Sequence, residues 1–532
     1  MRNEERGGGG RRADGGRSRL RIVIISSELT PYSKSGGLAD VASKLSISLS
    51  QMGHRVMTVA PAYKWYEGAV GTDVRRTFTL YGGGHDVHYL HQWCPTDPRE
   101  DGDPKMGVDR IFVQNANAFE RAGMYGDPGG HDYFDNLFRF ALFSWAALEG
   151  RGKREKRGGG GGGGKDEGRK EGGRGGEGRT RRRRMEKDEE EEEEEGNKAS
   201  GLADNSYYDN YKWVFPPQER GDGGVVDDGE CAKLLLGGIN MADRVVTVSP
   251  SYKEEIMTDG GGWGLQHNVR ARSDRLDGIL NGIDTEEWDP ETSKALPAQF
   301  SKSDLSGKAI CKEKLQEALG LQKNPNAPII AFIGRLAPQK GIDVLQECFH
   351  WLMGGDDQGV LGDAQLIMMG NGQAEYANFM RAAEGQYKGR ICGYVGFSSE
   401  MEQRIIAGAD ILIMPSRYEP CGLPQMYAQR YGTIPVVHAT GGLKDSVQQF
   451  EWREGGETVG TGWKFGNCDA NGLKWGLWNA LEIYKKKPEV WDNLRKRCME
   501  QDFSWIASAK KYIQLMEWAT MDPPKHEPWP FR

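Results

Sequence analysis

The stretch "LRIVIISSELTPYSKSGGLADV", residues 20–41, joins an apolar run to a lysine and a pair of glycines. Its core, Ile22–Ile25, is unbroken by polar residues, which is typical of a parallel strand buried on both faces. Gly36 and Gly37 would let the backbone approach a ligand closely, and Lys34 supplies a compact positive charge. A helix after the glycines would point its N-terminal amides at the same ligand. The stretch therefore predicts an anion site at the end of a strand.

Strand-like and helix-like segments alternate on both sides of this stretch. "GLADVASKLSISLSQMG" and "HRVMTVAPAY" follow it, and a second series begins at residues 327–336 and continues through 364–372, 409–419 and 433–447. This βαβ rhythm is typical of a doubly wound parallel sheet. The turn-rich residues 280–300 separate the two series and are plausible as a hinge. We expect an α/β protein with two Rossmann-like domains facing each other across a cleft.

The bulk composition narrows the class of protein. The chain has 532 residues, of which 37% are hydrophobic, enough for a large core and for two or more domains. A formal net charge of −7 points neither to nucleic acid nor to an anionic membrane. The eight cysteines form no C-x-x-C pair and no apolar run reaches transmembrane length, so we expect a soluble protein with reduced thiols.

Two low-complexity segments stand apart from the α/β pattern. Residues 1–20 lack the apolar residues of a core and should be disordered. Residues 151–196 consist of Gly, Arg, Glu and Lys with only four exceptions, so we expect a disordered insert there as well. Gly, Arg, Glu and Lys can each be encoded by purine-only codons. We therefore hypothesise a translated purine-rich repeat or retained intron, which the transcript sequence would test.

A pair of cations follows the first strand of the second series. "AFIGRLAPQKGID" places Arg335 and Lys340 just past an apolar run, with Gly334 and Gly341 freeing the backbone around them. A planar guanidinium and a compact ammonium together suit a diphosphate, whose charge grows when it leaves. An exposed basic loop explains this segment equally well when it is seen alone.

Two further segments lie at strand ends of the second series. In "SRYEPCGL", Glu419 follows an apolar strand. Open α/β sheets bind ligands at such strand ends, and a carboxylate there could contact sugar hydroxyls. The alternative is that Glu419 caps a helix. Gly422 and Leu423 then open a helix that could aim N–H groups at phosphate. "HATGGLKDSV", residues 438–447, again joins a strand to a helix through two glycines. Each signal is weak alone, but four of them at strand ends favour a ligand site.

A metal site is not predicted. His85, His88 and His91 lie close together in "GGHDVHYLHQW", but no acidic residue sits at ligand spacing beside them. The chain also lacks the G-x-S-x-G, H-E-x-x-H and Walker A motifs.

Taken in order, the motifs resemble those of the starch and glycogen synthases, which are retaining glucosyltransferases of the GT-B fold. The chain carries K-S-G-G-L-A-D at residues 34–40, G-R-L-x-x-Q-K-G at 334–341, E-P-C-G-L at 419–423 and T-G-G-L at 440–443. The resemblance runs from about residue 21 to 147 and from about 207 to 524. "YKWVFP" and "EWATMDPP" look more like plant and algal starch synthases than like bacterial glycogen synthases.

This resemblance implies ADP-glucose as donor and the non-reducing end of an α-1,4-glucan as acceptor, with no metal ion and no cofactor. It implies that Arg335 and Lys340 hold the diphosphate and that Glu419 contacts the transferred glucose. The residues implied to line the nucleotide-sugar site are Lys34, Gly36, Gly37, Asp40, Gly422, Leu423, Thr440, Gly441 and Gly442. The resemblance also allows complexes with other starch enzymes, and it involves no nucleic acid and no membrane.

One departure from the family pattern bears on activity. The family normally carries a D-W-H segment and an I-H-N segment in the first domain, and the tract at 151–196 takes their place. Without these strands the first sheet would be left with an open edge or gap. Three interpretations therefore compete: an active starch synthase, a catalytically impaired glucan- or nucleotide-binding homologue, and a mispredicted gene product. A GT-B enzyme that uses UDP-glucose is a further alternative.

The resemblance also sets the expected domains and location. We expect a disordered N-terminus at 1–20, an N-terminal catalytic domain at 21–285 interrupted by disorder at 151–200, a nucleotide-sugar-binding domain at 286–502, and a C-terminal helix and tail at 503–532. A plastid location follows from the family, and the cytosol is the alternative.

Overall fold

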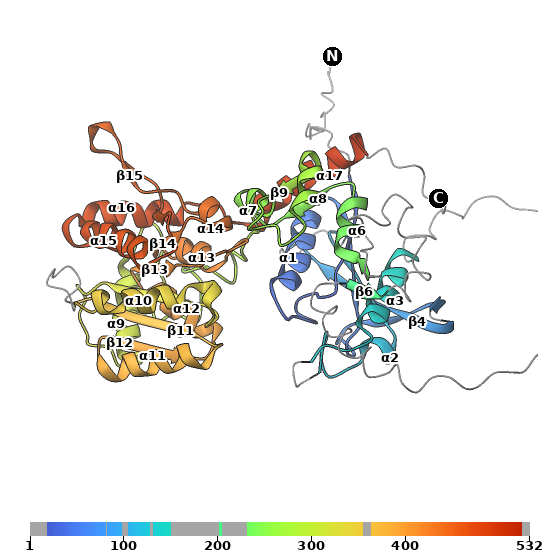
Figure 1. Cartoon of the computed structure of the whole chain (residues 1–532), viewed down its shortest axis with the longest axis horizontal. Coiled ribbons are helices and arrows are strands. Elements are labelled where there is room, and N and C mark those ends of the chain that lie inside the picture. The colour runs from blue at the N-terminus through green and yellow to red at the C-terminus, as the bar shows by residue number, and fades with distance from the viewer. Residues whose placement is uncertain are drawn as a thin grey trace, which may run out of the picture. The chain divides into compact units, whose positions relative to one another are not determined.

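The computed structural model describes residues 19–80, 82–97, 105–127, 131–149, 202–204, 231–354 and 363–523 (Figure 1). The segments predicted to be disordered, 151–196 and all but the last two residues of 1–20, lie outside the described residues. The chain divides into two compact units between Gly196 and Asn197. The domain boundary predicted at residue 285 stays a prediction.

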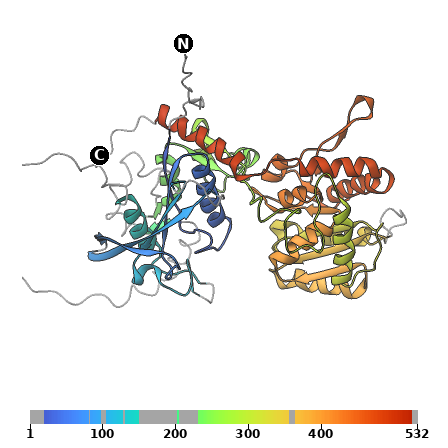
Figure 2. The same cartoon turned by 180° about the vertical axis from the view of Figure 1, so that it is seen from behind.

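The first unit contains a mixed five-stranded sheet in the order β1-β2-β5-β4-β3. Its strands are β1 (Arg21–Ile25), β2 (Arg55–Pro61), β3 (Val70–Leu80), β4 (Gly83–Pro95) and β5 (Gly107–Gln114). β1, β2 and β5 run parallel, as the sequence predicts, whereas β3 and β4 form an antiparallel hairpin that extends the sheet as the long blue strands of Figure 2. α1 (Gly37–Gln51) and α3 (Asn136–Glu149) pack through separate apolar clusters on this sheet.

The prediction that β1 is buried on both faces is wrong for most of its residues. Ile22 is buried, but Val23 and Ile24 are only partly covered and Ile25 is 38% exposed. The reason is that β1, within the described residues, is an edge strand hydrogen-bonded to β2 alone. Within the described residues, this unpaired side of β1 agrees with the open edge or gap predicted from the sequence.

The second unit is built on a six-stranded sheet in the order β12-β11-β10-β13-β14-β17, with every pairing parallel. The strands are β10 (Ile329–Ile333), β11 (Gln365–Gly370), β12 (Ile391–Val395), β13 (Ile411–Met414), β14 (Ile434–His438) and β17 (Trp463–Phe465). The chain works outward from β10 in one direction and then from β13 in the other, so the doubly wound prediction is confirmed here. The strand order reverses between β10 and β13, where such sheets bind ligands.

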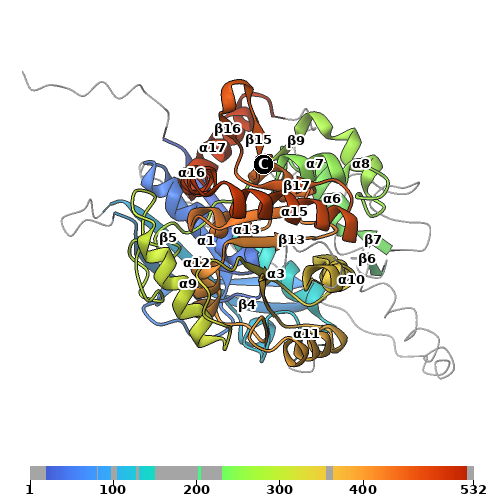
Figure 3. The ribbon, with the colours of Figure 1, turned by 90° about the vertical axis from the view of Figure 1, so that its left-hand side faces the viewer.

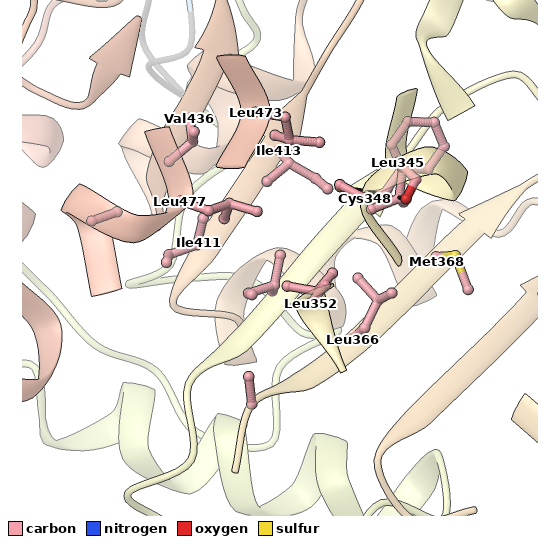
Figure 4. Close-up of a cluster of buried hydrophobic side chains, with 14 of the residues drawn as sticks. Leu345, Cys348, Leu352, Leu366, Met368, Ile411, Ile413, Val436, Leu473 and Leu477 are labelled. Carbon is pink, nitrogen blue, oxygen red and sulfur yellow. Dashed lines mark hydrogen bonds between the residues drawn. The ribbon is translucent and has the colours of Figure 1, made fainter. Parts of the chain in front are cut away.

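Helices cover both faces of this sheet because its central strands, β10 and β13, are apolar and buried at every position. In β10, Ile330 and Phe332 pack in one cluster with α10 (Ile342–Leu352), α11 (Ala374–Gln386), α15 (Ala470–Lys486) and α16 (Pro488–Met499). Ile329, Ala331 and Ile333 pack in the other cluster with α9 (Ser306–Ala318), α12 (Ser399–Gly408), α13 (Pro424–Arg430) and α14 (Gly441–Ser446). Figure 3 shows α10 and α11 on one side and α9 and α12 on the other. Figure 4 shows the first cluster, where Leu345 and Cys348 of α10 meet Leu473 of α15 around Ile413.

The remaining elements are short, apart from the last helix. They are α2 (Ala116–Phe119), β6 (Leu202–Asp204), β7 (Cys231–Lys233), α6 (Leu234–Met241), β8 (Val245–Thr247), α7 (Pro250–Ile256), α8 (Gln266–Ala271), η3 (Ser273–Arg275), β9 (Leu276–Gly278), η4 (Pro338–Lys340), β15 (Glu451–Trp452), η5 (Glu454–Gly456), β16 (Thr458–Val459) and α17 (Trp505–Met521). α17 confirms the closing helix predicted from sequence. None of the described helices is long and apolar enough to cross a membrane.

Candidate active site

The predicted cations lie at the carboxyl end of β10, beside the point where the strand order reverses. Arg335 lies two residues past the end of β10, and Lys340 ends the short helix η4. Gly341 then takes a left-handed conformation with φ of 71°. A side-chain carbon there would lie 1.9 Å from the Pro415 carbonyl oxygen, so only glycine lets η4 approach the end of β13 this closely.

This approach brings Lys340 against Glu419, which follows β13. The Lys340 Nζ and a Glu419 carboxylate oxygen are 2.5 Å apart, and Glu419 is only 6% exposed. The same carboxylate oxygen accepts a hydrogen bond of 3.2 Å from the Ser416 hydroxyl. Arg335 is held separately, because its guanidinium donates to the Gln339 side chain at 2.7 Å, and Gln339 donates to the Tyr418 carbonyl. The structure therefore brings together all three residues predicted to be catalytic.

A cavity of about 340 Å³ opens at this end of the sheet. Arg335 and Lys340 contribute to its wall, as predicted. Its other lining residues are Phe332, Ile333, Gly334, Met369, Gly370, Asn371, Phe397, Glu402, Ile413, Met414, Ser416 and Pro424. A volume of this size suits part of a small ligand, and two cations on one wall suit an anionic group of that ligand.

Glu402 is a lining residue that the sequence reasoning missed. It lies on α12 and is 7% exposed. Burial raises the pKa of Glu402 to about 7, and the neighbouring Glu287 carboxylate adds to the shift. The sequence "SSEMEQRI" places this glutamate two residues after an exposed one, so helical periodicity alone could have shown that it faces inward.

The E-P-C-G-L and T-G-G-L segments pack backbone to backbone beside this cavity. A side-chain carbon on Gly441 would lie 2.2 Å from the Glu419 carbonyl oxygen, and one on Gly442 would lie 2.0 Å from that of Cys421. The Gly442 N–H donates to the Glu419 carbonyl at 2.9 Å. Gly422 has φ of 67°, and Leu423 caps the start of α13. The two glycines of T-G-G-L therefore lie against the backbone of Glu419 and Cys421, and Gly422 and Leu423 follow at the start of α13.

A carboxylate already occupies the start of α14. The Thr440 hydroxyl and the Gly441 N–H both donate to one oxygen of Glu255, at 2.9 Å and 2.7 Å. Glu255 belongs to α7, which is further tied to α14 by Ser251 and Asp445. The N–H groups of Gly441 and Gly442 are thus engaged within the protein, although both were predicted to bind the donor. The Glu255 contact shows that this turn accepts an anionic oxygen.

The first unit holds the other predicted residues in the turn between β1 and α1. Lys34 pairs with Asp40 at 2.7 Å, and the Thr30 hydroxyl donates to Asp40 at 2.8 Å. A side-chain carbon on Gly36 or Gly37 would meet nothing within 4 Å, so their backbone borders open space. The four predicted residues of this unit therefore lie together at the start of α1.

Glu28 holds this turn in place and was not predicted. It is 3% exposed and accepts hydrogen bonds from the Ser35 N–H at 2.6 Å, the Ser35 hydroxyl at 2.5 Å and the Tyr125 hydroxyl at 2.7 Å. Burial alone would raise the pKa of Glu28, but the hydrogen bonds from Ser35, Tyr125 and Gly36 lower it overall. The carboxylate is therefore charged, and it fixes the loop that carries Lys34 and Gly36.

The three histidines of β4 do not converge. His85 contacts the Leu80 carbonyl at 3.2 Å, whereas His91 lies 3.0 Å from the Asp109 carboxylate on β5. The spacing of the histidines could not reveal the contact with Asp109, because Asp109 lies on a different strand. Within the residues that the structure describes, no group of three or more His, Cys, Asp or Glu side chains could hold a metal ion.

Comparisons with known proteins agree with this geometry. The starch synthase catalytic domain matches residues 21–155 and 199–271, and the group 1 glycosyl transferases match residues 313–498. Soluble starch synthase 1 of Oryza sativa subsp. indica is 38% identical over 94% of this chain and 79% of its own length. Starch synthase 1 of Arabidopsis thaliana is 37% identical over 94% of this chain and 78% of its own. This chain belongs to the starch synthase family.

A solved structure supports the same assignment at the level of the fold. The catalytic domain of starch synthase IV from Arabidopsis thaliana, bound to ADP and acarbose, is 26% identical and covers 95% of this chain and 100% of its own, with a TM-score of 0.71. The family resemblance and the predicted GT-B fold are thereby confirmed, and this starch synthase is a hexosyltransferase.

Proposed function

We propose that this starch synthase transfers glucose from ADP-glucose to the non-reducing end of an α-1,4-glucan with retention of configuration. The observation that carries the proposal is the convergence of Arg335, Lys340 and Glu419 at the end of the sheet where the strand order reverses between β10 and β13. The relative from Arabidopsis whose structure contains ADP and acarbose supports a nucleoside diphosphate and a glucan-like ligand.

In the proposed reaction the two cations act on the leaving group. Arg335 and Lys340 lie on one cavity wall, where they would hold the diphosphate and stabilise the negative charge that grows as the glycosidic bond breaks. These residues supply the positive charge that the leaving ADP requires, so we propose a reaction without a metal ion or cofactor. The acceptor hydroxyl would attack on the same face, which requires no carboxylate nucleophile.

Glu419 and the surrounding backbone would position the sugar. The Glu419 carboxylate, oriented by Ser416 and Lys340, would accept hydrogen bonds from the glucose hydroxyls. Gly422 and Leu423 would offer backbone groups to the donor. Thr440, Gly441 and Gly442 would do so after the Glu255 carboxylate moves away from the start of α14. From the first unit, Lys34, Gly36, Gly37 and Asp40 would line the nucleotide-sugar site.

The curated relatives support a location. Starch synthase 1 of Arabidopsis thaliana and soluble starch synthase 1 of Solanum tuberosum are both named as chloroplastic or amyloplastic. We propose that this protein also acts in a plastid, and these names lend no support to the cytosolic alternative.

A catalytically impaired homologue is the second candidate function. The observation that favours it is the open edge at β1, where Ile25 is 38% exposed because β1 pairs only with β2 within the described residues. Such a protein would bind nucleotide or glucan without turnover.

One experiment separates the candidates. Residues 1–532 are expressed as written, and transfer of labelled glucose to a glycogen primer is measured with ADP-glucose and, in parallel, UDP-glucose. Transfer from ADP-glucose alone supports the proposal, and transfer from UDP-glucose alone supports the other GT-B enzyme. Absence of transfer by folded protein supports the impaired homologue or a mispredicted gene product, which the transcript sequence across residues 150–200 then tells apart.

A further inference from the structure

Glu402 is a buried carboxylate on the cavity wall that the proposed function leaves unused. Its side chain lies on α12, is 7% exposed as a residue, and lines the same cavity as Arg335 and Lys340. Two residues earlier on the same helix, the Glu400 side chain is 60% exposed and pairs with Arg404 at 2.5 Å. Glu402 therefore faces inward while its neighbour on the helix faces solvent.

The Glu402 carboxylate lacks the partners that a buried carboxylate normally has. Within the described part of the chain, no hydrogen bond or ion pair reaches its oxygens, and the charge that acts on it is the repelling carboxylate of Glu287. A carboxylate that opens onto a cavity without a protein donor depends on water or a ligand for its hydrogen bonds. Such groups concentrate at binding and catalytic sites, where a ligand supplies the missing donors.

We propose that Glu402 binds the nucleoside half of the sugar-nucleotide donor by accepting hydrogen bonds from it. The inference rests on the proposed function, because it places the diphosphate on Arg335 and Lys340 at the same cavity. A nucleoside attached to that diphosphate would lie in the rest of the cavity, and it carries two kinds of donor, the ribose hydroxyls and the amino group of adenine. Phe397, 67% exposed, provides an apolar wall beside Glu402. Glu402 is thus a specificity-determining residue for the nucleotide.

Binding rather than activity tests this inference. The full chain, Glu402→Ala, Glu402→Gln and the matched control Glu400→Gln are titrated calorimetrically with ADP. At pH 8, where the carboxyl is charged, we expect the Glu402 variants to bind ADP at least about 10-fold more weakly, which is typical of losing a hydrogen bond to a charged group. Glu400→Gln should bind ADP as the unchanged chain does. Thermal unfolding and circular dichroism check that each variant is folded. Glu402→Gln is included because it keeps the shape of the side chain while removing its charge.

Three analogues identify the donor group. If a ribose hydroxyl donates, 2′-deoxy-ADP or 3′-deoxy-ADP should bind the unchanged chain as weakly as ADP binds Glu402→Ala. If the adenine amino group donates, inosine diphosphate should bind the unchanged chain that weakly. Binding of ADP by Glu402→Ala within threefold of the unchanged chain overturns the inference but leaves the proposed function standing. Full-strength binding of 2′-deoxy-ADP, 3′-deoxy-ADP and inosine diphosphate also overturns it. Failure of the unchanged chain to bind ADP overturns the proposed function as well.

Discussion

Lys340 and Glu419 are 79 residues apart in the sequence, yet their side chains form an ion pair of 2.5 Å at the ends of two neighbouring strands. The pair has a mechanistic consequence. A donor diphosphate would compete with Glu419 for the Lys340 ammonium, and the released carboxylate would then be able to accept hydrogen bonds from the sugar. The resting pair therefore holds both groups near the positions that the reaction requires.

Removing the charge of Glu419 should lower turnover more than substrate affinity. Glu419→Gln keeps the side-chain shape but leaves the Lys340 ammonium without its partner and weakens contacts to the sugar. We expect kcat to fall about 10²-fold, the loss typical of removing one group that stabilises a transition state. Steady-state rates with ADP-glucose measure this, and Glu317→Gln, which removes an exposed ion-pair partner of Lys314, is the control. A kcat unchanged in Glu419→Gln would exclude the residue from the reaction.

We expect that no other residue can replace Gly341, because a side chain at this position would meet the backbone of Pro415. Gly341→Ala combines a left-handed backbone with a contact of 1.9 Å to the Pro415 carbonyl, so we expect a loss of at least about 3 kcal/mol in the free energy of unfolding. Gly320→Ala is a matched control, because Gly320 has φ of 67° but open space around it. It should cost only about 1 kcal/mol. Equal losses in urea unfolding would show that the close approach of η4 to β13 is not required.

Glu255 should compete with the donor for the start of α14. Because its carboxylate accepts from the Thr440 hydroxyl and the Gly441 N–H, Glu255→Ala should free both groups and tighten ADP binding by about fivefold, the worth of one modest hydrogen bond. Asp445→Asn is the control, since Asp445 joins α7 to α14 through Ser251 without touching those groups. Calorimetric titration with ADP measures these affinities. Weaker ADP binding by Glu255→Ala would mean that Glu255 positions the turn instead.

Glu402 should make the protein less stable as the pH rises toward neutrality. Burial raises the pKa of its carboxyl from 4.5 to about 7, so between these values the folded state holds a proton that the unfolded state has lost. The contribution of this carboxyl to the free energy of unfolding is therefore fully present below pH 4.5 and is lost as the pH rises through 7. Glu402→Gln removes the effect and should gain on the order of 3 kcal/mol at pH 8 but little at pH 4.5. Urea unfolding at several pH values tests this, and a constant difference between the two proteins would refute it.

The second unit was the more predictable part of the fold. Most residues of its main strands are apolar, and β10, β11, β13 and β14 lie where the apolar runs of the sequence predict them. The first unit was less predictable, because the burial of a strand depends on how many neighbours it has. Nothing in "RIVII" shows that β1 pairs on one side alone within the described residues.

The residues of the candidate site were predictable only in part. Arg335, Lys340 and Glu419 could be named because each lies at a strand end, and parallel strands bring such ends together. Glu255 and Glu28 could not, because their roles arise from contacts with distant segments, at Gly441 and at Tyr125. Local sequence shows which element carries a side chain, but not which loop will pack against it.

The most direct test of the central claim is the rate of glucose transfer from ADP-glucose to glycogen by the unchanged chain and by Lys340→Ala. Arg335→Ala is measured beside it. If these cations stabilise the departing ADP, each variant should lose about 10²–10³-fold in rate. A loss of less than threefold in either variant would contradict the assigned role of that residue, and equal rates in all three proteins would place the reaction elsewhere.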